Sequence, residues 1–217
     1  MTKLTLTFDN GPTPGVTEGV LDALASRHLK ATFFLVGDRL VEPGALELAT
    51  LAHSQGHWIG NHTMQHGPPL GEWDDPDAAV DEIASAQQAL GSLAHPRRFF
   101  RPNGRGEVGP HLFNRPVVDY LVSHEYTVVL WSVYVRDSKV PLGWDERALE
   151  IVGVHDWDVL VLHDVANGGM NTLPRFLDTM LDRGIQFEQG FPAGVLPIDR
   201  GVITDAAATL LPRAVTR

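Results

Sequence analysis

Brief apolar runs alternate with longer amphipathic stretches along this 217-residue chain. The apolar runs are rich in Val, Ile, Leu and Phe and predict strands, at 3–8, 31–35, 57–60, 98–101, 127–132, 158–162 and 184–188. The amphipathic stretches predict helices, at 15–27, 43–55, 75–93, 110–124, 145–152 and 171–183. Because the two kinds alternate, we expect an α/β fold with a parallel sheet and crossover helices. The spacing alone does not separate an open sheet from a closed barrel.

No internal repeat or linker interrupts this alternation up to residue 188. We therefore expect a single domain over residues 1–217. The stretch 189–217 departs from the pattern and contains Pro192, Pro197 and Pro212. We interpret that stretch as a tail or an edge segment.

The composition excludes several classes of function. Twenty-seven acidic against seventeen basic residues give a net charge of −10, which argues against a nucleic-acid partner and does not favour polyanionic substrates. The absence of cysteine excludes disulfides and thiolate metal sites. No apolar run approaches the roughly 20 residues that span a bilayer, and Met1 leads straight into a strand pattern. We therefore expect no membrane partner and a cytoplasmic location.

Two segments near the amino terminus carry candidate chemistry. Asp9-Asn10-Gly11-Pro12 ends the first predicted strand, and catalytic groups collect at strand ends in α/β folds. The alternative to a catalytic role is an ordinary turn, which Asp or Asn before Gly also predicts. His62 and His66 are four residues apart, so on a helical turn both rings could converge on one ion. Two solvated histidines are the alternative.

Three later segments end or follow predicted strands in the same way. They are Arg101-Pro102-Asn103-Gly104, the stretch from Trp131 to Asp137, and Leu160-Val161-Leu162-His163. Taken singly, each has a structural alternative: a turn with a surface arginine, a core tryptophan, or a satisfied histidine. A histidine tuned by a carboxylate also suits proton transfer near neutral pH.

Together, the content and order of these five segments resemble the motifs of the polysaccharide deacetylase (NodB-like) family, carbohydrate esterase family 4. The resemblance covers about residues 3–188. It implies a distorted, incomplete (β/α) barrel of about seven parallel strands. It also implies a hydrolase of non-peptide carbon–nitrogen bonds, which removes an acetyl or other acyl group from an N-acylated sugar or small amide.

The resemblance also implies roles for individual residues. Asp9 matches the general base, Arg101 the arginine that orients it, His163 the general acid, and Asp137 the aspartate that tunes the acid. On the substrate side, Leu162 would line the pocket for the acyl methyl group, beside Asn103, Gly104 and Trp131. The implied cofactor is a divalent metal, with zinc as the expected ion, and its ligands would be His62, His66 and Asn10.

The chain departs from the family pattern at three motif positions. Asn10 replaces a metal-binding aspartate, Asn103 stands where an aromatic residue is usual, and Ser138 replaces a tryptophan. Losing a carboxylate beside a dication should weaken binding strongly. Three outcomes are open: a weak site, a site closed by another carboxylate such as Asp74 or Asp164, or no metal. We favour a weak or altered site over no metal, because both histidines are kept. A metal-independent hydrolase of small amides and a non-catalytic carbohydrate-binding protein remain the alternative functions.

Overall fold

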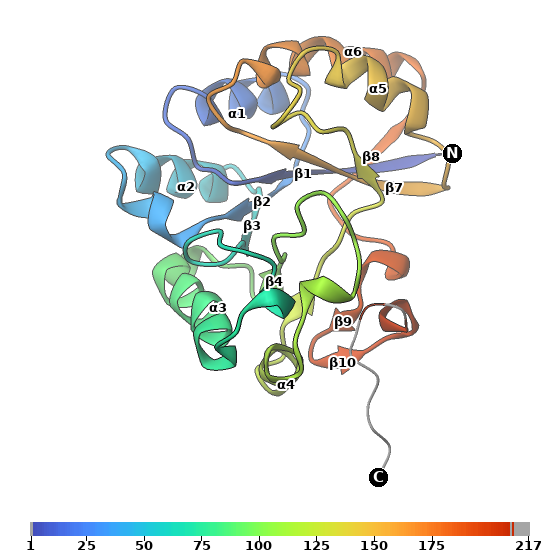
Figure 1. Cartoon of the computed structure of the whole chain (residues 1–217). Helices are drawn as coiled ribbons and strands as arrows, with labels where there is room; N and C mark the ends of the chain where they lie inside the picture. Colours follow the sequence, from blue (N-terminus) through green and yellow to red (C-terminus); the bar gives the residue numbers. More distant parts are fainter. Residues whose placement is uncertain (1, 209, 211–217) are drawn as a thin grey trace.

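The computed structural model describes residues 2–208 and 210 and is built around one ten-stranded sheet (Figure 1). The strands are β1 (Lys3–Asp9), β2 (Thr32–Leu35), β3 (Trp58–Asn61), β4 (Phe99–Phe100), β5 (Thr127–Val128), β6 (Val133–Tyr134), β7 (Trp157–His163), β8 (Gln186–Glu188), β9 (Ile198–Asp199) and β10 (Val202–Ile203). The α-helices are α1 (Thr17–Ala25), α2 (Ala45–Ser54), α3 (Pro76–Leu90), α4 (Arg115–Ser123), α5 (Trp144–Ile151) and α6 (Leu173–Asp182).

The sheet is mostly parallel and runs in the order β10-β9-β5-β4-β3-β2-β1-β7-β6, with β8 pairing β1 off this path. Strands β1 to β7 that neighbour one another pair in parallel, whereas β9 and β10 are antiparallel. In the part of the chain that the structure describes, the end strands β6 and β10 do not pair with each other. The result is the incomplete α/β barrel that the motifs implied.

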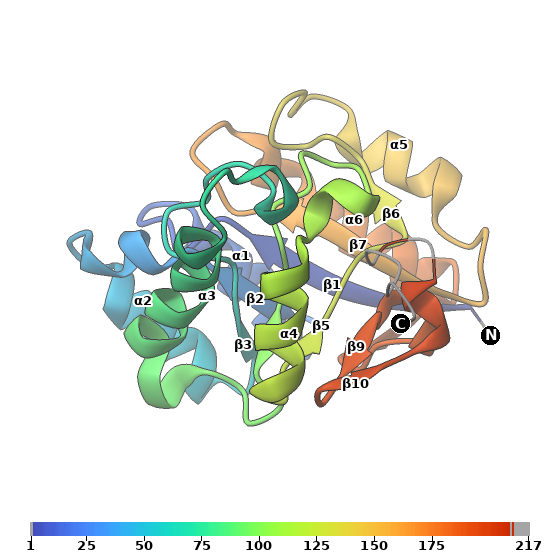
Figure 2. The same ribbon diagram turned by 60° about the horizontal axis from the view of Figure 1, so that its bottom comes forward.

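Alternation along β1 separates its two faces. Leu4, Leu6 and Phe8 are fully buried in a core cluster beneath α1, α5 and α6. Thr7 and Asp9 project from the other face, where they meet Arg101. A second core cluster joins β4 and β5 to α3 and α4, which pack side by side (Figure 2). The core therefore supports the sheet from the helix side and leaves polar groups on its inner face.

Most predicted elements are present, with two differences in the middle of the chain. The predicted helix 110–124 is divided into a short 3₁₀ turn at Pro110–Leu112 and helix α4. Asn114 causes the division, because its side chain accepts a hydrogen bond from the Val117 N–H and caps the new helix. The predicted strand 127–132 ends at Val128, and the chain then crosses to form β6 beside β7.

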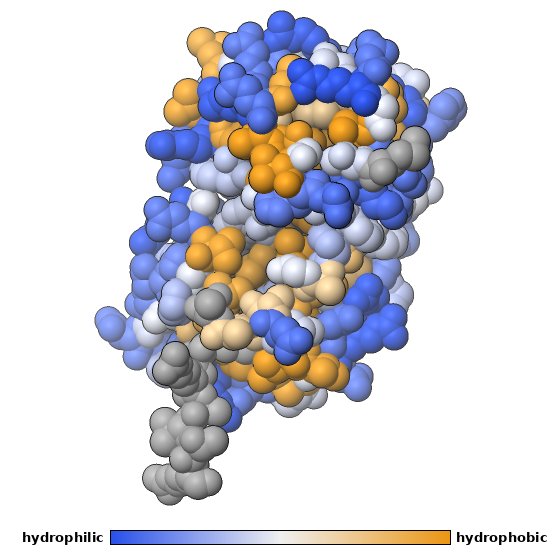
Figure 3. All heavy atoms as spheres, turned by 90° about the vertical axis from the view of Figure 1, so that its right-hand side faces the viewer, coloured by the Kyte–Doolittle hydropathy of each residue, from blue (hydrophilic) through white to orange (hydrophobic). Residues whose placement is uncertain are grey.

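The stretch after residue 188 adds an antiparallel hairpin to the edge of the sheet. Its strands β9 and β10 lie next to β5, and the rest of the expected tail, residues 209 and 211–217, lies outside the described residues. Val202 and Ile203 on β10 are 65% and 54% exposed. The face on the right-hand side of Figure 1, which Figure 3 shows from the front, carries several hydrophobic groups separated by hydrophilic side chains.

Among the described residues, none of the helices has the length and apolar character needed to cross a membrane.

Candidate active site

Four of the sequence-predicted site residues lie at the carboxyl ends of two pairs of neighbouring strands, β1 with β7 and β3 with β4, and β2 separates the two pairs. Asp9 ends β1 and is paired in register with His163, the last residue of β7. On the other side, Asn61 of β3 is in register with Phe100 of β4, so His62 and Arg101 leave the sheet at the same level. Parallel pairing thus brings together groups that are up to 154 positions apart (163 − 9). This edge is where ligands bind in parallel α/β sheets.

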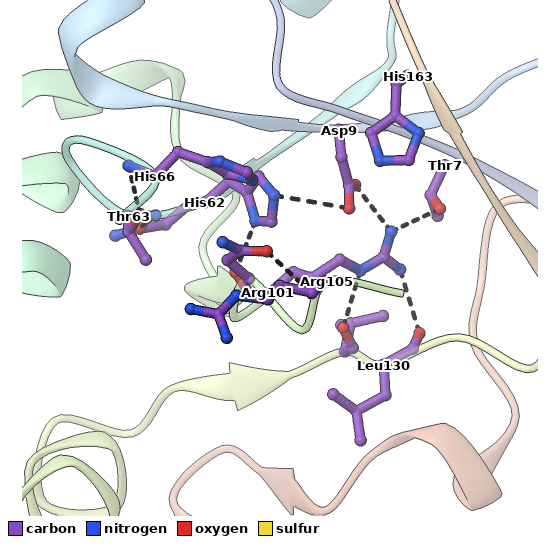
Figure 4. Close-up of polar contacts among 12 residues, drawn as sticks. Thr7, Asp9, His62, Thr63, His66, Arg101, Arg105, Leu130 and His163 are labelled. Carbon is purple, nitrogen blue, oxygen red and sulfur yellow. Dashed lines mark hydrogen bonds and ion pairs between the residues drawn. The ribbon is translucent and has the colours of Figure 1, made fainter. Parts of the chain in front are cut away.

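Arg101 holds the carboxylate of Asp9 inside the protein (Figure 4). Its side chain is fully buried and makes four hydrogen bonds: from Nη1 to Asp9 Oδ1 (2.9 Å) and Thr7 Oγ1 (2.6 Å), from Nε to the Val129 carbonyl (3.0 Å), and from Nη2 to the Leu130 carbonyl (3.1 Å). Because these four hydrogen bonds are directional, they fix the orientation of the guanidinium toward Asp9. Asp9 is thereby held as a buried, charge-compensated carboxylate with one oxygen, Oδ2, not bound by Arg101.

His163 is fixed by a second carboxylate, that of Asp137. Asp137 Oδ2 accepts the backbone N–H of His163 at 2.7 Å, and Oδ1 lies 2.9 Å from its Nδ1. Burial alone would lower the pKa of His163, but the hydrogen bond and negative charge of Asp137 outweigh burial and raise it. The contact occupies Nδ1, so Nε2 is the ring nitrogen left to exchange a proton in the cleft.

His62 and His66 form a pair of neutral imidazoles whose ring centroids are 4.9 Å apart. Burial lowers the pKa of both; for His66, burial and then the neighbouring His62 lower it to about 3. His62 Nδ1 lies 2.8 Å from the Arg101 carbonyl, which can only accept a hydrogen bond. The proton therefore sits on Nδ1, and Nε2 keeps its lone pair, 3.7 Å from Asp9 Oδ2.

The expectation that this pair sits on a helical turn is wrong. Residues 62–66 form an irregular bend, in which Thr63 and His66 have positive φ angles of 67° and 55°. The Thr63 hydroxyl accepts the His66 N–H at 3.1 Å and closes the bend. Local hydrogen bonding, rather than helical spacing, brings the two rings together.

Asn10 supplies the third donor beside these rings. Its backbone is left-handed, with φ 74°, a conformation that asparagine tolerates better than most residues. Its side-chain Oδ1 is buried without a hydrogen-bond partner, which is costly unless a ligand is bound there. Two imidazole lone pairs and an amide oxygen are a donor set that suits a divalent ion such as zinc. The residues therefore fit a metal, through neutral ligands only.

No carboxylate completes that site among the residues 2–208 and 210. The structure contains there no group of three His, Cys, Asp or Glu side chains that could hold an ion. Asp74 is exposed and outside the cleft. Asp164 is fully buried behind the loop, where it accepts a hydrogen bond from the Thr17 hydroxyl at 2.5 Å. Burial raises its pKa to about 7, and its carboxyl group occupies the space where a side chain on Gly11 would lie.

The site opens into a cleft with a volume of about 290 Å³. Its walls combine the acid–base and imidazole groups with two aromatic rings and a glycine-rich loop: Asp9, Asn10, His62, His66, Pro102, Asn103, Gly104, Arg105, Gly106, Trp131, Tyr134, Ser138, Lys139, Val161 and His163. Gly106, at φ 89°, packs against Tyr134 so closely that a Cβ would lie 2.1 Å from the ring. The loop can approach the aromatic wall only because glycine has no side chain.

One predicted lining residue is corrected by the structure. Leu162 is fully buried in the core and does not line the cleft. Successive strand residues face opposite sides, so Val161 shares the face of His163 and lines the cleft in its place. Sequence reasoning also missed Tyr134 and Lys139, which lie in loops and a two-residue strand without any periodic signal.

The fold and the site together define a class: an incomplete α/β barrel with acid, base and imidazole groups at the carboxyl ends of its strands. Residues 2–129, more than half of the chain, match the family model described as polysaccharide deacetylase. The chain therefore belongs to the polysaccharide deacetylase family, and the resemblance of its motifs is confirmed.

Individual relatives agree with this membership. The chain is 32% identical over 163 residues to the chitooligosaccharide deacetylase of Bradyrhizobium sp., covering 73% of this chain and 69% of the relative. It is 26% identical over 185 residues to the peptidoglycan-N-acetylglucosamine deacetylase PgdA of Listeria monocytogenes, covering 85% of this chain but 37% of that protein. This chain thus spans little more than a third of the Listeria relative. A family 4 carbohydrate esterase from Streptomyces lividans, solved with acetate, superposes with a TM-score of 0.73 at 25% identity, covering 90% of this chain and 96% of that one.

Proposed function

We propose that this protein hydrolyses the acetamide of an N-acetylated sugar, or another small amide, to acetate and a free amine. One observation carries the proposal: Asp9, bound by Arg101, and His163, bound by Asp137, are in register on β1 and β7 and face one cleft. Amide hydrolysis needs a base that takes a proton from water and an acid that protonates the leaving nitrogen. The names of the relatives, deacetylases of chitooligosaccharides and peptidoglycan N-acetylglucosamine, support the same chemistry.

Asp9 is the proposed base. Arg101 holds Oδ1 and compensates its charge, while Oδ2 points toward His62 Nε2 at 3.7 Å. A water that donates a hydrogen bond to Oδ2 would give that proton to Asp9 as its oxygen attacks the acyl carbon. The carbonyl double bond then opens to a tetrahedral oxyanion, which backbone N–H groups of the loop at Asn103 are proposed to stabilise.

His163 is the proposed acid. The raised pKa keeps the ring protonated to higher pH than a free histidine, and Asp137 keeps Nδ1 engaged so that the Nε2–H is the mobile proton. Collapse of the tetrahedral species breaks the carbon–nitrogen bond, and the departing amine takes that proton. The product pair is therefore a carboxylic acid and an amine, with no other reactant than water.

His62, His66 and Asn10 are the residues that would hold a divalent cation, with zinc as the proposed ion. When bound, such an ion polarises the acyl oxygen and lowers the pKa of water. Asn10 provides an amide oxygen without charge, so the affinity should be lower than for a site with a carboxylate at that position. The unpartnered Asn10 Oδ1 is the structural reason to propose the ion at all.

The size of the cleft favours a small substrate. Its volume of about 290 Å³ lies at the lower limit of typical ligand sites, which begin at roughly 300 Å³. Trp131 and Tyr134 offer flat apolar walls on which one sugar ring can stack. We therefore propose a single N-acylated sugar unit, free or at a chain end, as the bound group.

Acetate release from N-acetylglucosamine and its short oligomers tests the proposal. Asp9→Asn should lower turnover by about 100- to 10,000-fold, the usual contribution of a general base, with metal content nearly unchanged. Asp22→Asn, an exposed position on α1, is the matched control and should retain full activity. Undiminished turnover in Asp9→Asn would rule out the assignment of the base.

A metal-independent hydrolase of the same fold is the second candidate, and the neutral ligand Asn10 favours it. In this case Asp9 and His163 would act without an ion, and turnover would survive dialysis against a strong chelator. If dialysis abolishes turnover and zinc restores it, the metal-assisted reaction is supported. A protein that binds the sugars but releases no acetate under either condition would be a carbohydrate-binding member.

A further inference from the structure

The cleft of this acidic protein has a basic wall. Although the chain carries a net charge of −10, the described residues that line the cleft include two cations, Arg105 and Lys139, and one carboxylate, Asp9. That carboxylate is already compensated by Arg101 at 2.9 Å. Local charge in the cleft is therefore positive, opposite to the charge of the whole molecule.

Lys139 is the cation of the two that lacks a counter-charge. Arg105 pairs with Glu72 at 3.0 Å and is 56% exposed. The chain's other lysines also have partners, since Lys3 pairs with Glu188 and Lys30 donates to a backbone carbonyl. No ion pair joins Lys139 to a carboxylate within residues 2–208 and 210. An unpaired ammonium at a cleft wall is available for a ligand.

The loop that carries Lys139 is tied to the proposed acid. Asn167 Nδ2 donates to the backbone carbonyls of Asp137 at 3.0 Å and Ser138 at 3.1 Å, and the Lys139 N–H donates to the Arg136 carbonyl at 3.0 Å. Asp137 in turn fixes His163. Lys139 therefore lies two residues beyond the carboxylate that orients the acid, on the side of the cleft where the leaving amine is protonated.

We propose that Lys139 selects substrates that carry an anionic group, a carboxylate or a phosphate, on the amine side of the amide. The inference rests on the deacetylation proposed above and names its substrate class. The side chains of Asn10, His62 and His66, which also line the cleft, add no negative charge that would offset the exposed ammonium of Lys139. The negative charge of the whole protein acts at longer range, where salt screens it.

The experiment compares N-acetylglucosamine with two anionic forms of the same sugar, N-acetylglucosamine 6-phosphate and N-acetylmuramic acid, by acetate release. The variants are Lys139→Gln, which removes the charge, Lys139→Arg, which keeps it, and Arg136→Gln, which removes an exposed charge of the same loop outside the cleft. Binding of glucosamine and glucosamine 6-phosphate, the free amines, is measured in parallel by calorimetric titration.

We expect wild type to prefer at least one anionic substrate by about tenfold or more in kcat/KM, as for one hydrogen bond to a charged group. Lys139→Gln should remove most of this preference, mainly through KM, whereas Lys139→Arg and Arg136→Gln should keep it. Equal kcat/KM for neutral and anionic sugars, or a preference unchanged in Lys139→Gln, would overturn the inference.

If no sugar is hydrolysed, the proposed deacetylation fails, yet binding of glucosamine 6-phosphate in preference to glucosamine that depends on Lys139 would support the anion site. Equal binding of the two amines would overturn it.

Discussion

Replacing Arg101 with methionine should destabilise the protein far more than replacing an exposed arginine of the same cleft. The side chain is fully buried, makes four hydrogen bonds and stacks over the Phe34 ring at 4.1 Å. Methionine replaces the aliphatic stem of the arginine but leaves the Asp9 carboxylate and two backbone carbonyls without their donor. Breaking a buried ion pair by removing one partner costs about 3–5 kcal/mol.

The loss can be measured as a shift in the thermal midpoint. For a domain of this size, each kcal/mol lowers Tm by about 2–4 °C, so Arg101→Met should lower Tm by roughly 6–20 °C. Arg105→Met is the matched control, because that arginine is 56% exposed and its pair with Glu72 lies at the surface. Exposed pairs contribute about 0–1 kcal/mol, so the control should lose no more than roughly 4 °C.

A double-mutant cycle identifies the cause. If the uncompensated charge of Asp9 produces the loss, then Arg101→Met should cost less by about 0.5–3 kcal/mol in an Asp9→Asn background. Chemical unfolding of the four proteins in urea gives the coupling free energy directly. A loss for Arg101→Met no larger than that of Arg105→Met, or the same cost in both backgrounds, would refute the reasoning.

Three further predictions concern the acid, the first loop and the metal ligands. Because the pKa of His163 is raised above 6.5, activity should fall as pH rises through that higher value, and Asp137→Asn should move the alkaline limb of the pH–rate profile to lower pH. Gly11→Ala places a Cβ 2.3 Å from Asp164 Oδ2 and should destabilise the protein by about 1–3 kcal/mol, measured by urea unfolding. Asn10→Asp should raise zinc occupancy after purification without an affinity tag, measured by elemental analysis, because the added charge strengthens binding.

Each of these three predictions has a companion measurement that checks its physical reason. The bond between His163 and Asp137 also stabilises the fold below the ordinary histidine pKa and loses that contribution as pH rises through the raised value, so Asp137→Asn should reduce stability mainly at acidic pH. Gly19→Ala, on α1 with no atom within 4 Å of the new Cβ, should be neutral or stabilising. Equal zinc content in wild type and Asn10→Asp would mean that the amide is already an adequate ligand.

The sequence by itself predicted the α/β class, and the resemblance of its motifs to a known family added the incomplete barrel and the candidate site groups. Period-2 and amphipathic patterns are local properties of the chain, and they predicted β1, β7 and the α-helices other than α4 close to their observed bounds. The same period contained information that the resemblance overrode: Leu162 precedes His163 on one strand, so both cannot face the cleft. The motifs were also sufficient to predict the family. Each motif is weak alone, but the five motifs in this order are specific.

Tertiary structure decided which partners those groups have. Arg101, which follows β4, meets Thr7 and Asp9 of β1 and the Leu130 carbonyl. Strands β2 and β3 lie between β4 and β1 in the sheet, so only the curvature of the barrel brings these groups together, and no local pattern encodes it. The positive charge of the cleft likewise arises from where Lys139 is placed, and the net charge of the chain pointed the other way. Periodicity acts between residues a few positions apart, whereas a site depends on register between strands far apart in sequence. For this reason the sequence was enough to predict the candidate residues, whereas only the fold determined which of them contact one another.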